Sequence, residues 1–193
     1  RYRARERLWG PRLTPGLLIS SPQMRDPWFE RTLILLCQHN DEGALGLIVN
    51  REGDIGLQEV IDRLTEDHGE FGTLSNAEQK TWWGGPVGDG AGFVLFSGSV
   101  EEGEGWNIGP VAVSPSLERL AELIREGSGF ELCLGYAGWG PGQLAGEIET
   151  GSWLAADIDP SIIFDTPLDQ RYEKALAQIG LTPETIWMQP VNE

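Results

Sequence analysis

The residues best suited to chemistry lie together in one short segment, Cys37-Gln38-His39-Asn40. If this segment is an extended strand, Cys37 and His39 share a face, with Cα atoms about 7 Å apart. A nearby imidazole favours the thiolate, which would make Cys37 a nucleophile or a redox sensor. The alternative is a structural cysteine that fills apolar space, as free cysteine commonly does. Cys133 has leucine on both sides and is the more typical filler of the two.

A second segment with possible chemistry is the glycine-rich run Gly84–Gly92 (GGPVGDGAG). Glycine-rich loops cradle phosphate when they lead into a helix N-terminus, and a P-loop also needs a Lys-Ser/Thr pair. This run instead leads into the strand-like Phe93–Phe96, so a hairpin or a bulged connection is the better prediction. Two Cys and two His do not form a familiar zinc pattern, and no Gly-x-Ser-x-Gly is present. We therefore expect no metal and no cofactor.

Hydrophobic periodicity indicates the elements that would position these residues. Apolar runs predict strands at Leu17–Ser20, Thr32–His39, Gly43–Asn50, Phe93–Ser97, Val111–Val113, Phe130–Tyr136 and Ile162–Phe164. Helical spacing predicts helices over Leu57–Leu64, Leu117–Ile124 and Tyr172–Ile179, and Gln143–Thr150 adds a shorter one. Strands and helices alternate without a regular βαβ pattern, which favours an α+β fold with a mainly antiparallel or mixed sheet.

Two details of these elements concern helix ends and loops. For the helix that contains Leu117, we expect Ser114 as the N-cap, Pro115 at the first helical position and Gly127 at the end. The segments most expected to be flexible are Glu66–Glu78 and the acidic, glycine-rich Gly98–Gly105. Neither has the character of a linker between domains.

Tryptophan tends to occur beside glycine, as in Trp82-Trp83-Gly84-Gly85, Gly105-Trp106 and Gly138-Trp139-Gly140. Glycine gives a bulky indole room in a tight loop, and the indole N–H needs a partner. Corner packing in a β-rich core explains this pattern most simply. The alternative is a pocket with aromatic walls.

The overall charge limits the classes of partner. The chain has 193 residues, with 14 Lys+Arg against 30 Asp+Glu and a net charge of -16. Residues 1–12 hold five Arg and one Glu, so residues 13–193 carry a charge of -20. This makes direct nucleic-acid binding an unfavoured function. We expect 1–12 to be a flexible basic extension, the alternative being a tether to an acidic surface, and 13–193 to form a single domain.

Composition also suggests where the protein works. No apolar run reaches the roughly 18 residues that a membrane span needs, so we expect no membrane partner. Residues 1–20 lack the pattern of a secretory signal, and two cysteines fit a reducing compartment. A cytoplasmic location is the resulting expectation.

Three motifs in order resemble the AlgH/YqgE family of bacterial proteins. They are Asp26–Asn50 (DPWFERTLILLCQHNDEGALGLIVN), Gly84–Val87 (GGPV) and Gly135–Leu144 (GYAGWGPGQL). Glu147, Trp153 and Phe164–Pro167 also fall where the family places them, so the resemblance spans roughly residues 13–190. One departure is Asn50-Arg51-Glu52, where many relatives have Asn-(Arg/Lys)-Pro.

The resemblance implies a fold and a compartment, but no settled activity. The implied fold is a single compact α+β domain, with a folded and partly split mixed sheet flanked by about three to four helices. The family is cytosolic, bacterial and largely uncharacterised, and one branch carries the label of a transcriptional regulator. The high acidity of residues 13–193 argues against direct DNA binding by this chain. A cysteine recurs in relatives at the position of Cys37, which favours the reactive-thiol interpretation.

The leading hypothesis is a non-enzymatic regulatory protein that senses a ligand or a redox change, with an unknown protein or small molecule as its partner. Its site would be a polar cleft built from family motifs: Cys37, His39, Asn40, Asn50, Arg51, Gly85, Tyr136, Trp139 and Gln143. The alternative is an enzyme of unknown reaction with Cys37 as nucleophile and His39 as base. A thiol–imidazole pair beside a concave pocket would favour the enzyme.

Overall fold

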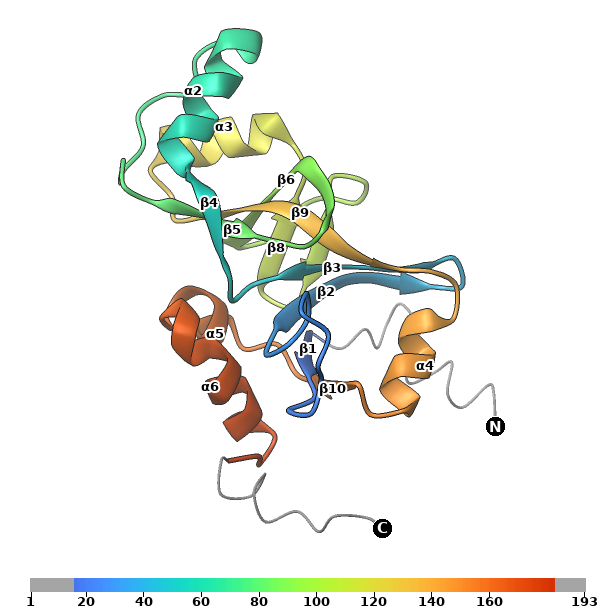
Figure 1. Cartoon of the computed structure of the whole chain (residues 1–193). Coiled ribbons are helices and arrows are strands. Elements are labelled where there is room, and N and C mark those ends of the chain that lie inside the picture. The colour runs from blue at the N-terminus through green and yellow to red at the C-terminus, as the bar shows by residue number, and fades with distance from the viewer. Residues whose placement is uncertain (1–15, 183–193) are drawn as a thin grey trace, which may run out of the picture.

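A ten-stranded sheet runs through residues 16–182, the part of the chain that the computed structural model describes (Figure 1). Its strands are β1 (Leu17–Ser20), β2 (Leu33–Asn40), β3 (Gly43–Ile48), β4 (Glu52–Gly56), β5 (Lys80–Trp83), β6 (Val87–Ser97), β7 (Trp106–Ile108), β8 (Val111–Ser114), β9 (Glu131–Trp139) and β10 (Trp153–Ala156). The main order is β10-β1-β2-β3-β9-β6-β8-β7. The basic segment 1–12, expected to be a flexible extension, lies outside the described residues.

Strand β9 joins the two halves of this sheet. Toward its end it pairs with β3, placing Ala44 opposite Trp139, while its earlier residues pair with β6 and β5. Cys133 therefore lies between Phe93 on one side and Trp82 on the other. The β5–β9 pair is parallel and the other pairs are antiparallel, so the expected mixed α+β sheet is confirmed.

Five α-helices and one 3₁₀ helix flank the described part of the sheet. They are α2 (Leu57–His68), α3 (Leu117–Glu126), α4 (Gln143–Glu149), α5 (Pro160–Phe164) and α6 (Arg171–Gln178), with the 3₁₀ turn η1 (Leu168–Gln170). In Figure 1, α2 and α3 lie beside the half of the sheet that contains β4, β5, β6, β8 and β9. Helices α5 and α6 lie beside β1 and β2. Four of the α-helices match expectation, and α5 is additional.

The prediction of a strand at Ile162–Phe164 is wrong, because these residues belong to α5. A capping signal before them determines the outcome. The Asp159 carboxylate accepts a hydrogen bond from the Ser161 N–H at 2.9 Å, and Pro160 occupies the first turn, where its missing N–H costs nothing. Ile162 is fully buried, as its apolar character requires, but its side chain enters the core from a helix and not from a strand.

Helix α3 begins two residues later than expected. Ser116, not Ser114, is the N-cap, and its hydroxyl accepts from the Arg119 N–H at 3.3 Å. Ser114 is instead the last residue of β8, paired with Val94 of β6. The expected end is confirmed, because Gly127 adopts a left-handed conformation with φ of 67°.

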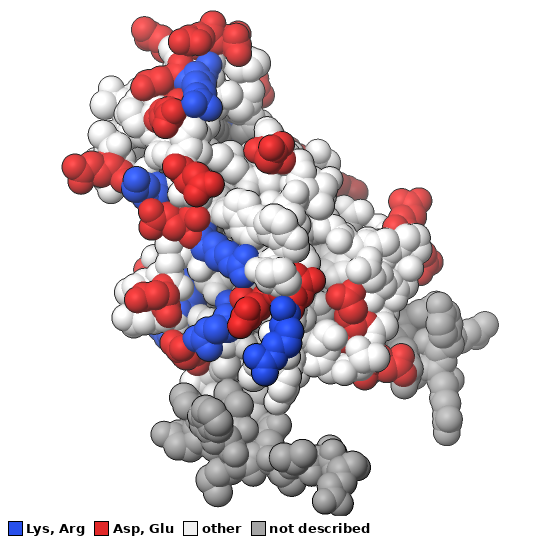
Figure 2. Space-filling view, in the orientation of Figure 1, with Lys and Arg blue, Asp and Glu red and all other residues white. Residues whose placement is uncertain are grey.

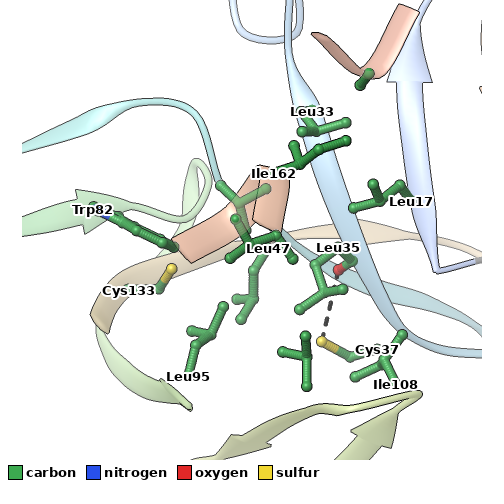
Figure 3. Close-up of a cluster of buried hydrophobic side chains, with 14 of the residues drawn as sticks. Leu17, Leu33, Leu35, Cys37, Leu47, Trp82, Leu95, Ile108, Cys133 and Ile162 are labelled. Carbon is green, nitrogen blue, oxygen red and sulfur yellow. Dashed lines mark hydrogen bonds between the residues drawn. The ribbon is translucent and has the colours of Figure 1, made fainter. Parts of the chain in front are cut away.

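The core is divided between the two faces of the sheet. The four apolar residues at 33–36 of β2 are fully buried, because this strand is covered on both faces of the sheet. Their side chains alternate between two hydrophobic clusters. Figure 3 shows the larger cluster, in which Leu35 of β2, Leu47 of β3 and Ile162 of α5 meet.

A third hydrophobic cluster lies beneath α2 and α3. Segment Glu66–Glu78, expected to be flexible, contributes Phe71 and Leu74 to it. Both side chains are at most 9% exposed, so packing against the helices holds this connection to the rest of the domain.

The glycine-rich run forms a bend at Pro86 followed by a bulged strand, which agrees with the bulged connection that the sequence favoured as one of two alternatives. The register between β6 and β9 shifts between Val87 and Gly92, which marks the bulge. Before it, Gly85 has φ of 153°, and a Cβ there would overlap the carbonyl of Tyr136. Glycine is therefore required where the chain between β5 and β6 touches the backbone of β9.

Candidate functional site

A groove of about 860 Å³ lies at the end of β2. One wall is formed by residues 37–40 of β2, and the opposite wall by residues 101–103 and 105–109, which include β7. Asp157 and Ile158, which follow β10, and Gly16, which precedes β1, complete the lining. The groove therefore gathers parts of the chain that are more than a hundred residues apart in sequence.

Three of the nine residues predicted for the site line this groove: Cys37, His39 and Asn40. Asn40 is exposed, and its Oδ1 atom accepts a hydrogen bond from the Glu42 N–H at 2.9 Å. Asn40 therefore stabilises the turn between β2 and β3.

Cys37 lies at a β-bulge, which alters the simple alternation expected from sequence. Leu36 is paired with Gly46 and Gln38 with Leu45, so Cys37 is the extra residue on β2. Its side chain joins the large core cluster, and the residue is 8% exposed. Figure 3 shows the thiol directed back along the strand, with a hydrogen bond from Sγ to the carbonyl of Leu35 at 3.7 Å.

This environment stabilises the thiol form of Cys37. Burial raises its pKa well above the ordinary value, because a thiolate would lose its hydration. The hydrogen-bond partner of the thiol is a backbone carbonyl rather than the imidazole of His39. The geometry therefore lacks the activated thiol–imidazole pair that nucleophilic catalysis requires.

His39 lines the groove and has a ring nitrogen that lacks a hydrogen-bond partner among the described residues. The residue is half-buried, and its Nδ1 atom is buried without a hydrogen-bond partner in residues 16–182. Burial lowers the pKa of the imidazole, which favours the neutral ring near pH 7. An unpaired ring nitrogen costs free energy, and either a ligand or a small turn of the ring toward the groove would recover it.

The rim of the groove is acidic. Glu101, Glu102 and Asp157 are exposed, and none of them forms an ion pair within the described part of the chain. Nearby Glu104 behaves differently, because its carboxylate pairs with Arg119 at 2.7 Å. That pairing lowers the pKa of Glu104. The three rim carboxylates are thus the free negative charges of this site.

Asn50 and Arg51, predicted as ligand-binding residues, hold a loop instead of lining the groove. The Asn50 side chain donates to the Arg31 carbonyl and accepts from the Leu33 N–H, both at 2.9 Å. The Arg51 guanidinium donates to the carbonyls of Trp28 at 2.6 Å and Glu30 at 2.9 Å. These bonds fix the connection between β1 and β2.

The surface around this loop combines basic and aromatic groups. The Arg51 guanidinium lies 5.4 Å from the ring centroid of Trp83, which stacks on the exposed Trp28 at 5.6 Å. Figure 2 shows Lys and Arg gathered near the middle of one face, while Asp and Glu are spread over the whole of it. Because the guanidinium of Arg51 already donates to two backbone carbonyls, its role is first of all structural.

The remaining predicted residues lie in or beside β9, outside the groove lining. Gly85 contacts the backbone of Tyr136, whose ring packs edge-on against Phe93 at 6.1 Å. Trp139 is 6% exposed and packs edge-on against Trp153 at 5.9 Å. Its neighbourhood is corner packing, as the simpler interpretation of the Gly-Trp pattern expected.

Gln143 has a local role at the start of α4. Its Oε1 atom accepts a hydrogen bond from the Gly140 N–H at 3.0 Å, which closes the turn after β9. The six predicted residues outside the groove thus share one property. Each has a packing or hydrogen-bonding role within the fold.

Sequence reasoning missed the acidic and aromatic residues of the groove. Trp106, Glu101, Glu102 and Asp157 were not among the predicted site residues, although all four line the groove. A signal was present in the acidic run that ends in Gly105-Trp106. This run becomes part of the groove only because β7, which pairs with β8, also contacts β2.

Residues 16–182 contain no group of three or more His, Cys, Asp and Glu side chains arranged to hold a metal ion. Within the same range, no helix combines the length and apolar character needed to cross a bilayer.

Comparison with known proteins gives consistent matches over nearly the whole chain. The model of the AlgH-like family matches residues 17–184. A UPF0301 protein of Ralstonia nicotianae is 40% identical over 174 residues, covering 89% of this chain and 90% of that protein. A UPF0301 protein of Pseudoalteromonas translucida is 37% identical over 175 residues, covering 86% and 94%.

Two solved structures are similar in fold. The solution structure of the AlgH protein from Pseudomonas aeruginosa has a TM-score of 0.72 and 33% sequence identity, covering 93% of this chain and 95% of that one. The crystal structure of protein DIP2367 from Corynebacterium diphtheriae has a TM-score of 0.67 and 21% identity, covering 91% and 92%. The second likeness concerns the fold alone.

Proposed function

This chain belongs to the AlgH-like family, and from that premise we propose that it is a non-enzymatic regulatory protein that binds a ligand in the groove at the end of β2. The function of the family is not established, so the support comes from the site. The observation that carries the proposal is the groove itself. Its volume of about 860 Å³ lies within the range of roughly 300–1,000 Å³ that is typical of small-molecule sites.

The polar groups of the groove support binding more than catalysis. His39 offers a neutral imidazole with an unpaired nitrogen, which is the kind of group that orients a ligand. Cys37 offers a buried, protonated thiol, which is a poor nucleophile and a poor redox sensor. A catalytic role for the Cys37/His39 pair has no comparable support in the geometry.

The proposal includes a cytoplasmic location and a partner other than nucleic acid. Cys37 and Cys133 are both free and buried, which suits a reducing compartment. The charge of -20 over residues 13–193 would repel a phosphate backbone.

The test is a ligand screen with a variant in which the groove is blocked. Gln38 is exposed and lines the groove, so Gln38→Trp would fill part of the space without disturbing the core. Glu52→Trp, on an exposed position of β4 outside the lining, is the matched control. The probes are a panel of amino-acid amides, nucleotides, sugars and organic acids, each at millimolar concentration.

Binding would be followed by NMR through the imidazole signals of His39 and the indole N–H signal of Trp106. We expect at least one class of probe to shift both signals in the wild type and in Glu52→Trp, but not in Gln38→Trp. If the whole panel leaves both signals unchanged, the groove is not a small-molecule site and the proposal is refuted.

A further inference from the structure

The groove has an uneven distribution of charge, with acidic groups on its rim and no basic Lys or Arg side chain among its described lining residues. Glu101 and Glu102 come from the connection between β6 and β7, whereas Asp157 comes from the segment after β10. Two separate parts of the chain therefore bring carboxylates to one groove. No described basic residue neutralises them, although Glu104, in the same connection, has Arg119 as its partner.

An aromatic side chain and a neutral acceptor line the same groove. Trp106 is partly buried and is held by Phe93, with ring centroids 6.2 Å apart. An indole face attracts cations through its quadrupole. On the β2 wall, a neutral His39 can accept a hydrogen bond and adds no positive charge that would repel a cation.

We propose that the ligand of this groove is a guanidinium group, as carried by an arginine side chain. Its planar fork can pair with the rim carboxylates while its face stacks on Trp106, a combination that a compact lysine ammonium satisfies less well. An anionic ligand would instead meet three uncompensated carboxylates. This inference rests on the proposed function, because it names the chemistry of the ligand that the groove binds.

Two sources could supply the arginine. One is the segment 1–12, which contains five Arg and precedes Gly16, itself part of the groove lining, by only a few residues. The other is an arginine of a different polypeptide. Both present the same guanidinium, so the experiment must identify the chemistry first and the source second.

The chemistry is tested with N-acetyl-arginine amide as the probe and N-acetyl-citrulline amide as its neutral isostere. NMR signals of His39 and Trp106 in the full chain report binding. We expect saturable shifts with the arginine probe, weakening as salt rises, and none with the citrulline probe. The triple variant Glu101→Gln/Glu102→Gln/Asp157→Asn should bind about tenfold more weakly, as expected for the loss of three exposed ion pairs.

A matched variant controls for the overall change of charge. Asp67→Asn/Glu70→Gln/Asp89→Asn removes the same number of charges at exposed positions outside the lining, and should bind like the wild type. The inference is overturned if citrulline binds as well as arginine, or if the rim variant keeps wild-type affinity. If the arginine probe fails but another panel member binds in a manner blocked by Gln38→Trp, the proposed function stands and the guanidinium assignment falls.

The source is distinguished by replacing all five arginines of the segment 1–12 with glutamine in the full chain. If these arginines occupy the groove, the variant should bind the added probe more tightly than the wild type, since a competitor is gone. Unchanged affinity would assign the groove to an arginine of another polypeptide. Either result supports the guanidinium site, provided that the rim variant weakens binding as described.

Discussion

Replacing Arg171 with methionine should lower the free energy of unfolding by about 3 kcal/mol. The residue is 5% exposed, and its guanidinium donates to the Thr166 carbonyl at 2.8 Å and to the Val49 carbonyl at 2.6 Å. It also lies 4.5 Å from the ring centroid of Trp82. Methionine would occupy much of the same space but leave both carbonyls without this donor.

The magnitude follows from two destabilising contributions and one stabilising contribution. Each carbonyl that loses a charged donor costs about 1.5 kcal/mol, and loss of the cation–π contact adds about 1 kcal/mol. Removing a buried charge raises the free energy of unfolding by roughly 1 kcal/mol, because burial disfavours the charged form and lowers the pKa of Arg171. The expected net loss is therefore about 3 kcal/mol.

The assay is urea unfolding followed by far-UV circular dichroism, which does not depend on the fluorescence of Trp82. The matched control is Arg63→Met, because Arg63 is exposed and has a single ion pair with Glu59 at 2.8 Å. We expect the control to change stability by no more than about 0.5 kcal/mol. A loss below about 1 kcal/mol for Arg171→Met would refute this account of how α6 is attached to the sheet.

Four further predictions concern single residues. Burial raises the pKa of Glu131, so its folded state holds a proton more tightly than the unfolded state and its ionisation lowers stability as pH rises. Glu131→Gln should therefore be more stable than the wild type at pH 7 in urea unfolding, with the difference closing toward about pH 4. For His39 the pKa is lowered, so the unfolded state takes up the proton first and stability falls as pH drops below about 6.5. His39→Gln should lack this loss when unfolding at about pH 7.5 and pH 5 is compared. Gly85→Ala should cost more than about 2 kcal/mol through backbone overlap, whereas Gly90→Ala, which has open space, should cost far less; equal values would contradict the close approach. Iodoacetamide should alkylate Cys37 far more slowly in the native protein than in urea, as followed by mass spectrometry, and an equally fast native reaction would revive the nucleophile hypothesis.

The sequence predicted the fold where local and tertiary preferences agree. The apolar runs of β1, β2 and β3 supply fully buried side chains, so their hydrophobicity alone was enough to identify them. Strand β4, with the sequence EGDIG, has no such pattern and forms because β5 supplies hydrogen-bond partners. At Ile162 the choice between helix and strand was decided by the Asp159 cap rather than by the three apolar residues.

The candidate site was only partly predictable for a related reason. Cys37 and His39 do line one groove, but the bulge between Leu36 and Gln38 and the burial of the thiol depend on long-range packing. Arg51 has the residue type of a ligand-binding group, yet backbone carbonyls more than twenty residues away in sequence take up its donors. The acidic rim of the groove depends on the packing of β7 against β2, two strands that are distant in sequence.

The position of β9 has a consequence for biosynthesis. This strand supplies partners to β3, β5 and β6, yet it is translated after all three. While the ribosome is still making residues 1–130, these earlier strands have open edges that could pair with other nascent chains. Emergence of Glu131–Trp139 closes those edges together, so a translational pause before this point should raise the chaperone demand of the chain more than a pause after it.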